Sequence, residues 1–291
     1  MKKNSENRTT INRKTTPPPK IAAVHDISCV GRCSLTAVVP VLSNMGMQVV
    51  PLPTALLSTQ TDGYENFSFL DLSDEAEKII SHWKKIGMSF DAVYTGFLGN
   101  EKQIETVLDF FEYCKEKNEN CKFFVDPVMG DNGKKYKTYT KKMCKSMRKL
   151  VKRADVITPN VTEACILSDI PYKEDLKEDE IKKMLSPLGA LGPEITIITG
   201  VQNKKGIGAV YLENGKYGSY FSKKAKREYP GSGDVFASIV LAEIMNKKPL
   251  DYSVKKACDF VYLSSVFTEK AKTPLREGLA FEGLLQTLCE K

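Results

Sequence analysis

The segment Pro230-Gly231-Ser232-Gly233-Asp234 carries residue types that can bind an anion and move a proton. Its two glycines allow a turn with positive φ, and the apolar run from Val235 to Met245 that follows predicts a buried helix. The first amides of a helix lack intrahelical acceptors and together carry roughly half a positive charge. We therefore expect the amides of this turn to hold a phosphate or a developing oxyanion.

Asp234 would lie inside that anion-binding turn. A carboxylate repels a bound phosphate, so its expected role is to accept the proton of a hydroxyl group that attacks a γ-phosphoryl group. The alternative is an ordinary helix cap, because Asp and Ser are favoured at helix starts and Gly-Ser-Gly is common in loops.

Two more segments place polar oxygen atoms after predicted strands. Asp126-Pro127-Val128-Met129-Gly130-Asp131 follows the strand Lys122–Val125, and its first carboxylate should lie at the carboxyl edge of a sheet. Thr158-Pro159-Asn160-Val161-Thr162-Glu163 should open a helix with Asn160 and Glu163 on one face of the first turn. This pair either reaches a hydrated Mg²⁺ or only caps the helix.

The elements that would position these residues alternate along the chain. Apolar runs predict strands at Ile21–His25, Met47–Leu52, Phe90–Tyr94, Lys122–Val125, Asp155–Thr158 and Ile195–Thr199. Helical spacing predicts helices at Ser34–Met45, Ser73–Ile86, Ile104–Cys114, Met143–Val151, Val235–Met245 and Val254–Val261, and near Leu284. An Asn-Gly turn predicts a hairpin of Ala209–Glu213 and Lys216–Phe221. This order predicts an α/β fold: a central, mostly parallel sheet with helices on both faces and an antiparallel hairpin near one edge.

Composition and charge limit the classes of function. With 291 residues and 42% hydrophobic content, the chain can form one large domain, which we assign to residues 20–291. The formal charge is +7, but residues 1–20 contribute +5 of it, so the rest is nearly neutral. This distribution argues against nucleic-acid and membrane partners for the folded part. Residues 1–19, basic and ending in three prolines, are expected to be a disordered tail and not a signal peptide.

The cysteines and the apolar runs indicate the compartment. The eight cysteines show no CxxC spacing and no nearby histidine cluster, which argues against zinc and a disulfide framework. Cys114, Cys165 and Cys258 should be buried thiols, whereas Cys29 and Cys33 flank a loop after the first strand. No apolar run approaches the roughly 18 residues of a membrane span. We therefore expect a cytoplasmic protein.

Taken together with Thr199-Gly200, the three polar segments resemble the ordered motifs of the ribokinase-like superfamily, and within it the sequence is most similar to pyridoxal/pyridoxamine kinases. The resemblance extends from about Ile21 to Lys270. It implies transfer of the ATP γ-phosphoryl group to the 5′-hydroxymethyl group of a B6 vitamer (pyridoxal, pyridoxamine or pyridoxine) in salvage to pyridoxal 5′-phosphate. It also implies Mg²⁺ and a homodimer, with a monovalent cation as an additional candidate cofactor.

The resemblance also assigns roles to single residues. It makes Asp234 the base, with the amides of Gly231, Ser232 and Gly233 in the anion hole. It makes Asp126 and Glu163 the residues that orient Mg²⁺ or its waters. The positions implied to contact ATP or its metal are Asp126, Asp131, Tyr136, Thr158, Asn160, Glu163, Thr199 and Gly200. The positions implied to contact the substrate are Asp26, Thr54, Phe97 and Asp234. Asp131 and Tyr136 belong to a lysine-rich loop that matches a flap closing over ATP.

Asp26 is a departure from this pattern, because pyridoxal kinases commonly have Ser after the first strand and hydroxymethylpyrimidine kinases have Asp. We hypothesise that Asp26 accepts from a protonated pyridine nitrogen or pairs with the 4′-ammonium of pyridoxamine. The alternative is that it caps backbone amides of the loop Ile27–Gly31. Two other functions stay open: a hydroxymethylpyrimidine (phosphate) kinase of thiamine synthesis, and a non-catalytic B6-binding protein on the same fold.

Overall fold

The computed structural model describes residues 17–174 and 176–289. Residues 1–16 of the predicted tail lie outside the described residues. The chain is already tied to the sheet at Pro19, whose carbonyl accepts from the Gln48 amide at 2.9 Å.

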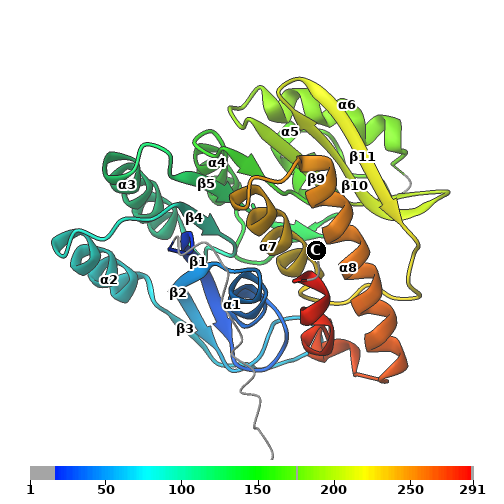
Figure 1. Ribbon diagram of the computed structural model, residues 1–291, viewed down its shortest axis with the longest axis horizontal. Coiled ribbons are helices and arrows are strands. Elements are labelled where there is room, and N and C mark those ends of the chain that lie inside the picture. Colours follow the sequence, from blue (N-terminus) through cyan, green and yellow to red (C-terminus); the bar gives the residue numbers. More distant parts are fainter. Residues whose placement is uncertain (1–16, 175, 290–291) are drawn as a thin grey trace, which may run out of the picture.

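A nine-stranded sheet forms the middle of the molecule (Figure 1). Its strands in spatial order are β11 (Lys216–Ser222), β10 (Gly206–Glu213), β9 (Ile195–Asn203), β8 (Val156–Ile157), β5 (Lys122–Val125), β4 (Ala92–Thr95), β1 (Lys20–Ser28), β2 (Gln48–Leu57) and β3 (Phe69–Asp71). The six strands from β9 to β2 pair in parallel, and β10, β11 and β3 pair antiparallel at the two edges. The predicted fold class and the predicted hairpin are confirmed.

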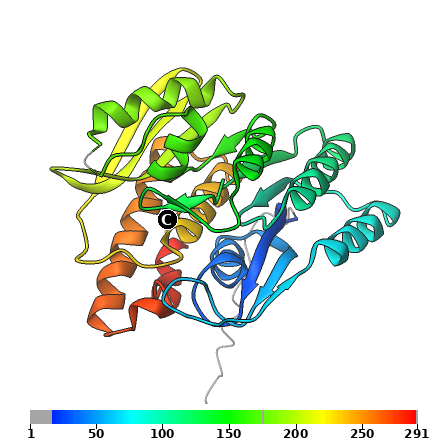
Figure 2. The same ribbon diagram turned by 180° about the vertical axis from the view of Figure 1, so that it is seen from behind.

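Helices cover both faces of the sheet (Figures 1 and 2). They are α1 (Ser34–Asn44), α2 (Ser73–Lys85), α3 (Glu101–Lys117), α4 (Lys141–Val151), α5 (Val161–Ser168), α6 (Glu178–Gly189), α7 (Ser232–Met245) and α8 (Leu250–Lys270), followed by the 3₁₀ helices η1 (Leu275–Glu277) and η2 (Glu282–Leu288). Several of these helices begin with a side chain that caps the first turn. In α3, for example, Asn100 Oδ1 accepts from the Gln103 amide.

Two separate apolar cores follow from the alternation of side chains along the strands. Ala22 and Val24 of β1 face a core built with α2 to α6, whereas Ile21 and Ala23 face one built with α1, α7 and α8. Helix α7 is buried along most of its length, as the unbroken apolar run predicts.

The predicted end of the second strand is wrong. Pro51 and Pro53 were expected to end the second strand, but β2 continues to Leu57. Strand β3 pairs only with residues 55–57, so the outer side of β2 is unpaired where the prolines lie. A proline in an edge position loses no ladder hydrogen bond, and the strand can run through it.

Three elements were not predicted: β3, α6 and the small hairpin of β6 (Gly130–Asp131) and β7 (Lys134–Lys135). The two hairpin strands have two residues each, which is too short for a period to appear in the sequence. Strand β9 also runs past Thr199 to Asn203, because β10 continues to pair with it.

The parallel strands all end at one edge of the sheet, which we call the carboxyl edge. Asp26, Asp126 and Asn160 lie at or just after the ends of β1, β5 and β8, and α7 begins beside them. Within the described ranges, no helix is long and apolar enough to cross a membrane.

Candidate active site at the carboxyl edge

The turn before α7 is built around Gly231. Its φ is +81°, and a side chain there would overlap with the carbonyl oxygen of Arg32. The Leu279 amide donates to the Pro230 carbonyl at 3.0 Å, and Arg32 forms a bridge with Gly278. The turn is therefore held between the loop after β1 and the C-terminal segment.

The amides at the start of α7 are available to a ligand. The Ser232 amide donates to Tyr229 and the Val235 amide to Gly231, but within the described residues the amides of Gly233 and Asp234 have no acceptor. Gly233 is exposed, with no heavy atom within 4 Å of where a Cβ would lie. An anion can approach these two donors directly.

The carboxylate of Asp234 lies in the first turn of α7 and is only 15% exposed. Its Oδ2 accepts from the Ser34 amide at 2.9 Å. Burial, with a smaller contribution from the negative charge of Asp26, raises the pKa of Asp234 to about 7 against the opposing hydrogen bond from Ser34. A carboxylate with this pKa is suited to accept a proton near neutral pH.

His25, which the sequence analysis did not single out, lies next to this carboxylate. Its Nδ1 is 4.0 Å from Oδ1 of Asp234, and its ring packs edge-on against Tyr94 with 4.4 Å between centroids. The side chain is fully buried, and burial lowers the pKa of His25 to about 3, so the ring is neutral. A side chain at Gly96 would overlap with this ring, so the glycine makes room for the histidine. The glycine after Thr95 was the one sequence signal that could have pointed to a bulky neighbour.

Asp26 is buried, and both its oxygens accept from serine hydroxyls. Ser34 donates to Oδ1 at 2.5 Å and Ser28 to Oδ2 at 3.0 Å. Burial raises the pKa of Asp26, although both hydroxyls oppose the shift. Burial, followed by the charges of Asp234 and Asp26, raises the pKa of the neighbouring Cys33 to about 12, so the Cys33 thiol stays protonated.

Asn160 and Glu163 form the predicted capping pair at α5. Asn160 Oδ1 accepts from the Glu163 amide at 2.9 Å, and Glu163 Oε2 accepts from the Asn160 amide at 2.8 Å. The other Glu163 oxygen accepts from the Met129 amide at 3.0 Å, and Asn160 Nδ2 donates to the Gly130 carbonyl at 2.8 Å. The pair caps the helix and also fixes the segment after Asp126.

Asp126 and Glu163 are buried carboxylates with no lysine or arginine partner among the described residues. Burial, followed by the charge of Asp234, raises the pKa of Asp126 well above its ordinary value. Burial, followed by the charge of Asp126, does the same for the pKa of Glu163. Three carboxylates thus repel one another at one end of the sheet without a fixed positive charge.

This arrangement fits a divalent cation bound largely through water and phosphate oxygens. Carboxylate oxygens are the ligands that Mg²⁺ prefers, and Mg²⁺ usually takes only one or two of them from the protein. Both Glu163 oxygens already accept backbone amides, which leaves Asp126 with the more accessible lone pairs. No cluster of three or more His, Cys, Asp or Glu side chains suited to a metal occurs in residues 17–174 and 176–289.

The β6–β7 hairpin brings Tyr136 to the same place. Burial raises the pKa of Tyr136, and so do the charges of Glu163, Asp131, Asp126 and Asp234. The tyrosine is still 40% exposed, and Asp131 is also exposed. The turn of the hairpin is attached to α5, because the Gly133 amide donates to Thr162 Oγ1 at 2.9 Å.

The remaining predicted residues lie along the same edge or behind it. The Thr158 amide donates to the Val125 carbonyl at 3.2 Å. Thr199 forms a β-bridge with Asn160, and Gly200 is exposed with a φ of +72°. Thr54 and Phe97 are adjacent, since the Thr54 hydroxyl donates to the Phe97 carbonyl at 3.0 Å. Thr54 is only 1% exposed, so any contact with a ligand would be through the partly exposed Phe97.

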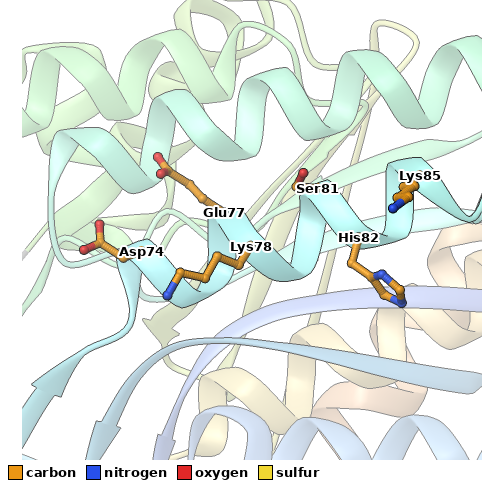
Figure 3. A pocket seen from close by; sticks show the side chains of 6 residues that line it. All are labelled: Asp74, Glu77, Lys78, Ser81, His82 and Lys85. Atoms are coloured by element: carbon orange, nitrogen blue, oxygen red, sulfur yellow. The ribbon is translucent and has the colours of Figure 1, made fainter.

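A second concave surface lies on α2, at the end of the molecule formed by α2 and α3 (Figures 1 and 3). It is lined by one helix face: Asp74, Glu77, Lys78, Ser81, His82 and Lys85. Lys102 Nζ neutralises two of its carboxylates, at 2.7 Å from Asp74 and 3.1 Å from Glu77. Because these groups are exposed and already paired, the carboxyl edge is the better candidate for chemistry.

Comparisons with known proteins agree with this geometry. The chain matches the phosphomethylpyrimidine kinase family over residues 21–273. A crystal structure of a putative phosphomethylpyrimidine kinase from Bacteroides thetaiotaomicron is 40% identical, with a TM-score of 0.90 and coverage of 96% of each chain. Another crystal form of that protein contains pyridoxal. The pyridoxal kinase of Lactobacillus plantarum is 30% identical, with a TM-score of 0.84 and coverage of 93% of this chain and 96% of that one.

Curated relatives extend the match. The pyridoxal kinase of Dictyostelium discoideum is 25% identical over 264 residues, which cover 84% of each protein. Other matches, to two putative pyridoxal kinases, span only about half of those proteins, 48% and 47%.

The mostly parallel sheet with helices on both faces and an antiparallel hairpin at one edge has the ribokinase-like fold of these structures. The chain belongs to the phosphomethylpyrimidine kinase family, and its similarity to pyridoxal kinases confirms the group predicted from the sequence.

Proposed function

We propose that this protein is an ATP-dependent kinase that phosphorylates the 5′-hydroxymethyl group of B6 vitamers. The observation that carries the proposal is the position of Asp234: a partly buried carboxylate with a pKa of about 7, in the same helical turn as two amides without acceptors among the described residues. Phosphoryl transfer needs such a proton acceptor and such donors within one small volume. The pyridoxal kinases among its relatives support the choice of substrate.

In the proposed reaction, the amides of Gly233 and Asp234 stabilise the negative charge that develops on the transferred phosphoryl group. The oxygen of the vitamer hydroxyl forms a bond to the γ-phosphorus of ATP, and the bond between that phosphorus and the leaving oxygen of ADP breaks. Asp234 accepts the proton that the hydroxyl loses. Tyr136 and the exposed lysines of the hairpin cover the phosphates, which limits the access of water.

Asp126 and Glu163 would hold Mg²⁺. Asp126 would bind the cation through its carboxylate oxygens, whereas Glu163, whose oxygens both accept backbone amides, would mainly orient water bound to the cation. When bound, the cation neutralises charge on the ATP phosphates. The polar residues Thr158, Asn160, Thr199, Gly200 and Asp131 would line the nucleotide along the carboxyl edge. A monovalent cation is a further candidate, supported by the excess of buried negative charge.

A hydroxymethylpyrimidine kinase is the second candidate, favoured by the name of the matched family and by Asp26. A purified protein incubated with ATP and pyridoxal, pyridoxamine, pyridoxine or hydroxymethylpyrimidine separates the two. We expect phosphorylated product from at least one B6 vitamer, with a kcat/KM well above that for the pyrimidine. Product from the pyrimidine alone would reverse the assignment. No product from any substrate would favour a non-catalytic B6-binding protein.

We also propose that the enzyme is a cytoplasmic homodimer. All eight cysteines are free, which fits a reducing compartment. Leu56, Phe69 and Leu70 are exposed at the β2–β3 edge, and an exposed apolar edge often marks a protein interface. Light scattering on the eluted protein should give the mass of two chains, and the mass of one chain would refute the dimer.

A further inference from the structure

Ser34 connects the buried carboxylate of Asp26 and the partly buried carboxylate of Asp234 at the proposed active site. Its backbone amide donates to Asp234 Oδ2 at 2.9 Å, and its hydroxyl donates to Asp26 Oδ1 at 2.5 Å. The side chain of Ser34 is nearly inaccessible, with 9% of the residue exposed. No other described residue makes a hydrogen bond to the Asp234 carboxylate. The orientation of the expected base therefore depends on the position of one amide.

That amide is held in an unfavourable backbone conformation. Ser34 is the first residue of α1, yet its φ is +49°, in the left-handed region that disfavours residues with a Cβ. Such strain persists only where the surroundings fix it, and it gathers at functional sites. The Ser34 hydroxyl bond to Asp26 is the contact that can fix it, because a hydroxyl bound to a carboxylate is a strong, charge-assisted donor.

We propose that Ser34 is a positioning residue for phosphoryl transfer, and that Asp26 acts on the base Asp234 through it. Asp26 holds the Ser34 hydroxyl, this contact keeps the strained backbone in place, and the amide then fixes the orientation of the Asp234 carboxylate. This inference rests on the proposed function. It also gives Asp26 a role that does not depend on which vitamer is bound.

Two serines donate to Asp26, and only one of them reaches Asp234. Ser28 donates to Asp26 Oδ2 at 3.0 Å and makes no bond to Asp234. Ser28→Ala is therefore a matched control for Ser34→Ala, because each removes one hydroxyl from the same carboxylate. Ser34→Gly is the informative second variant. It also lacks the hydroxyl, but glycine adopts a positive φ without the steric cost.

Steady-state kinetics with pyridoxal and with pyridoxamine test the proposal. We expect Ser34→Ala to lower kcat about 10-fold or more with KM for ATP within about twofold, since a small misplacement of a catalytic group has effects of this size. The kcat of Ser34→Gly should be at least about threefold higher than that of Ser34→Ala. The kcat of Ser28→Ala should stay within about twofold of wild type. A kcat for Ser34→Ala equal to that of Ser28→Ala would overturn the proposal.

The role of Asp26 is tested by combining variants. If Asp26 acts through Ser34, Asp26→Ser should lower kcat for both vitamers by the same factor and add no further loss to Ser34→Ala. If Asp26 instead contacts the 4′-ammonium of pyridoxamine, the loss should be about 10-fold greater for pyridoxamine than for pyridoxal and should multiply with that of Ser34→Ala. The second result would refute the indirect role.

Amide hydrogen exchange at Ser34, followed by NMR, needs no substrate. It therefore tests the link from Asp26 to the Ser34 backbone even if the wild-type protein phosphorylates no vitamer, and so separates failure of this link from failure of the proposed function. Exchange at this amide should be at least about 10-fold faster in Asp26→Ser than in wild type and unchanged in Ser28→Ala. Equal exchange in Asp26→Ser and wild type would contradict the proposal.

Discussion

We propose that Asp234 is required for activity, whereas its charge opposes stability. Its folded-state pKa of about 7 lies above the ordinary value of 3.8, so the folded protein binds its proton more tightly than the unfolded chain does. The stability that depends on this proton is complete below about pH 4 and is lost as the pH rises through about 7. Above that pH, the buried charge lowers the free energy of unfolding.

Replacing Asp234 by Asn should therefore stabilise the protein at pH 8 by about 1–3 kcal/mol, a range reduced from the full shift because the side chain keeps some contact with water. The gain should shrink as the pH is lowered from 8 to 5. Chemical denaturation of both proteins at these two pH values measures it. A gain that is the same at both would mean that the Asp234 pKa is not raised by folding.

Most of the candidate site residues could be identified from the sequence because their motifs are local. Gly231, Gly233 and Asp234 lie within four residues, and Asn160 and Glu163 within one helical turn. His25 and Ser34 could not be found in this way, because their roles arise from contacts with Asp234, 209 and 200 positions away in the chain. His25 also lies in an apolar strand, where its ring resembles any other buried aromatic side chain.

The β6–β7 hairpin is the element that we expect to contribute most directly to nucleotide affinity. Its turn is fixed to α5 through Gly133 and its base through Asn160, while Lys134, Lys135 and Tyr136 are exposed. A charge-rich loop can also be only a solvated surface. Burial and the charges of nearby carboxylates raise the pKa of Tyr136, and on this basis we expect the residue to lie near the bound phosphates.

Tyr136→Ala should raise KM for ATP about 3- to 10-fold and more than it raises KM for the vitamer, because the hairpin covers phosphates and not the ring. Tyr252→Ala is the matched control, since Tyr252 on α8 is 42% exposed and remote from the carboxyl edge. A larger effect on the vitamer KM would exclude this role.

Helices and strands were predicted correctly where a hydrophobic pattern repeats several times along the sequence. Prediction failed where pairing with a distant strand determines the bounds of an element. Helix α3 shows its stripe over several turns, and β10 and β11 are marked by an Asn-Gly turn. Strand β2 runs through two prolines only because its outer neighbour β3 is three residues long. No local signal in the sequence contains that information.

The active site joins segments from both ends of the described chain. The loop after β1 is held by the C-terminal segment, because Arg32 Nε donates to Glu282 Oε1 at 2.5 Å and its amide to the Glu277 carbonyl at 3.3 Å. Arg32 in turn touches Gly231. The C-terminal segment therefore holds the loop that carries Ser34 next to the turn that carries Asp234.

The predicted tail precedes the first contact of the described chain with the sheet. Deletion of residues 1–18 leaves Pro19, whose carbonyl is the first contact with β2 at Gln48. We expect turnover within about twofold of the full chain, since the removed residues have no core-forming pattern. A large loss of turnover with an unchanged melting temperature would show that the tail takes part in catalysis.

The most direct test of the account is turnover of Asp234→Asn with ATP and the best vitamer. Asn keeps the shape and the amides of the turn but cannot accept the proton, so kcat should fall about 10²- to 10⁴-fold with ATP affinity unchanged or tighter. Asp251→Asn, which removes an exposed carboxylate from the first turn of α8, should keep wild-type turnover. Near-normal turnover of Asp234→Asn would contradict the account, because another group would then have to accept the proton.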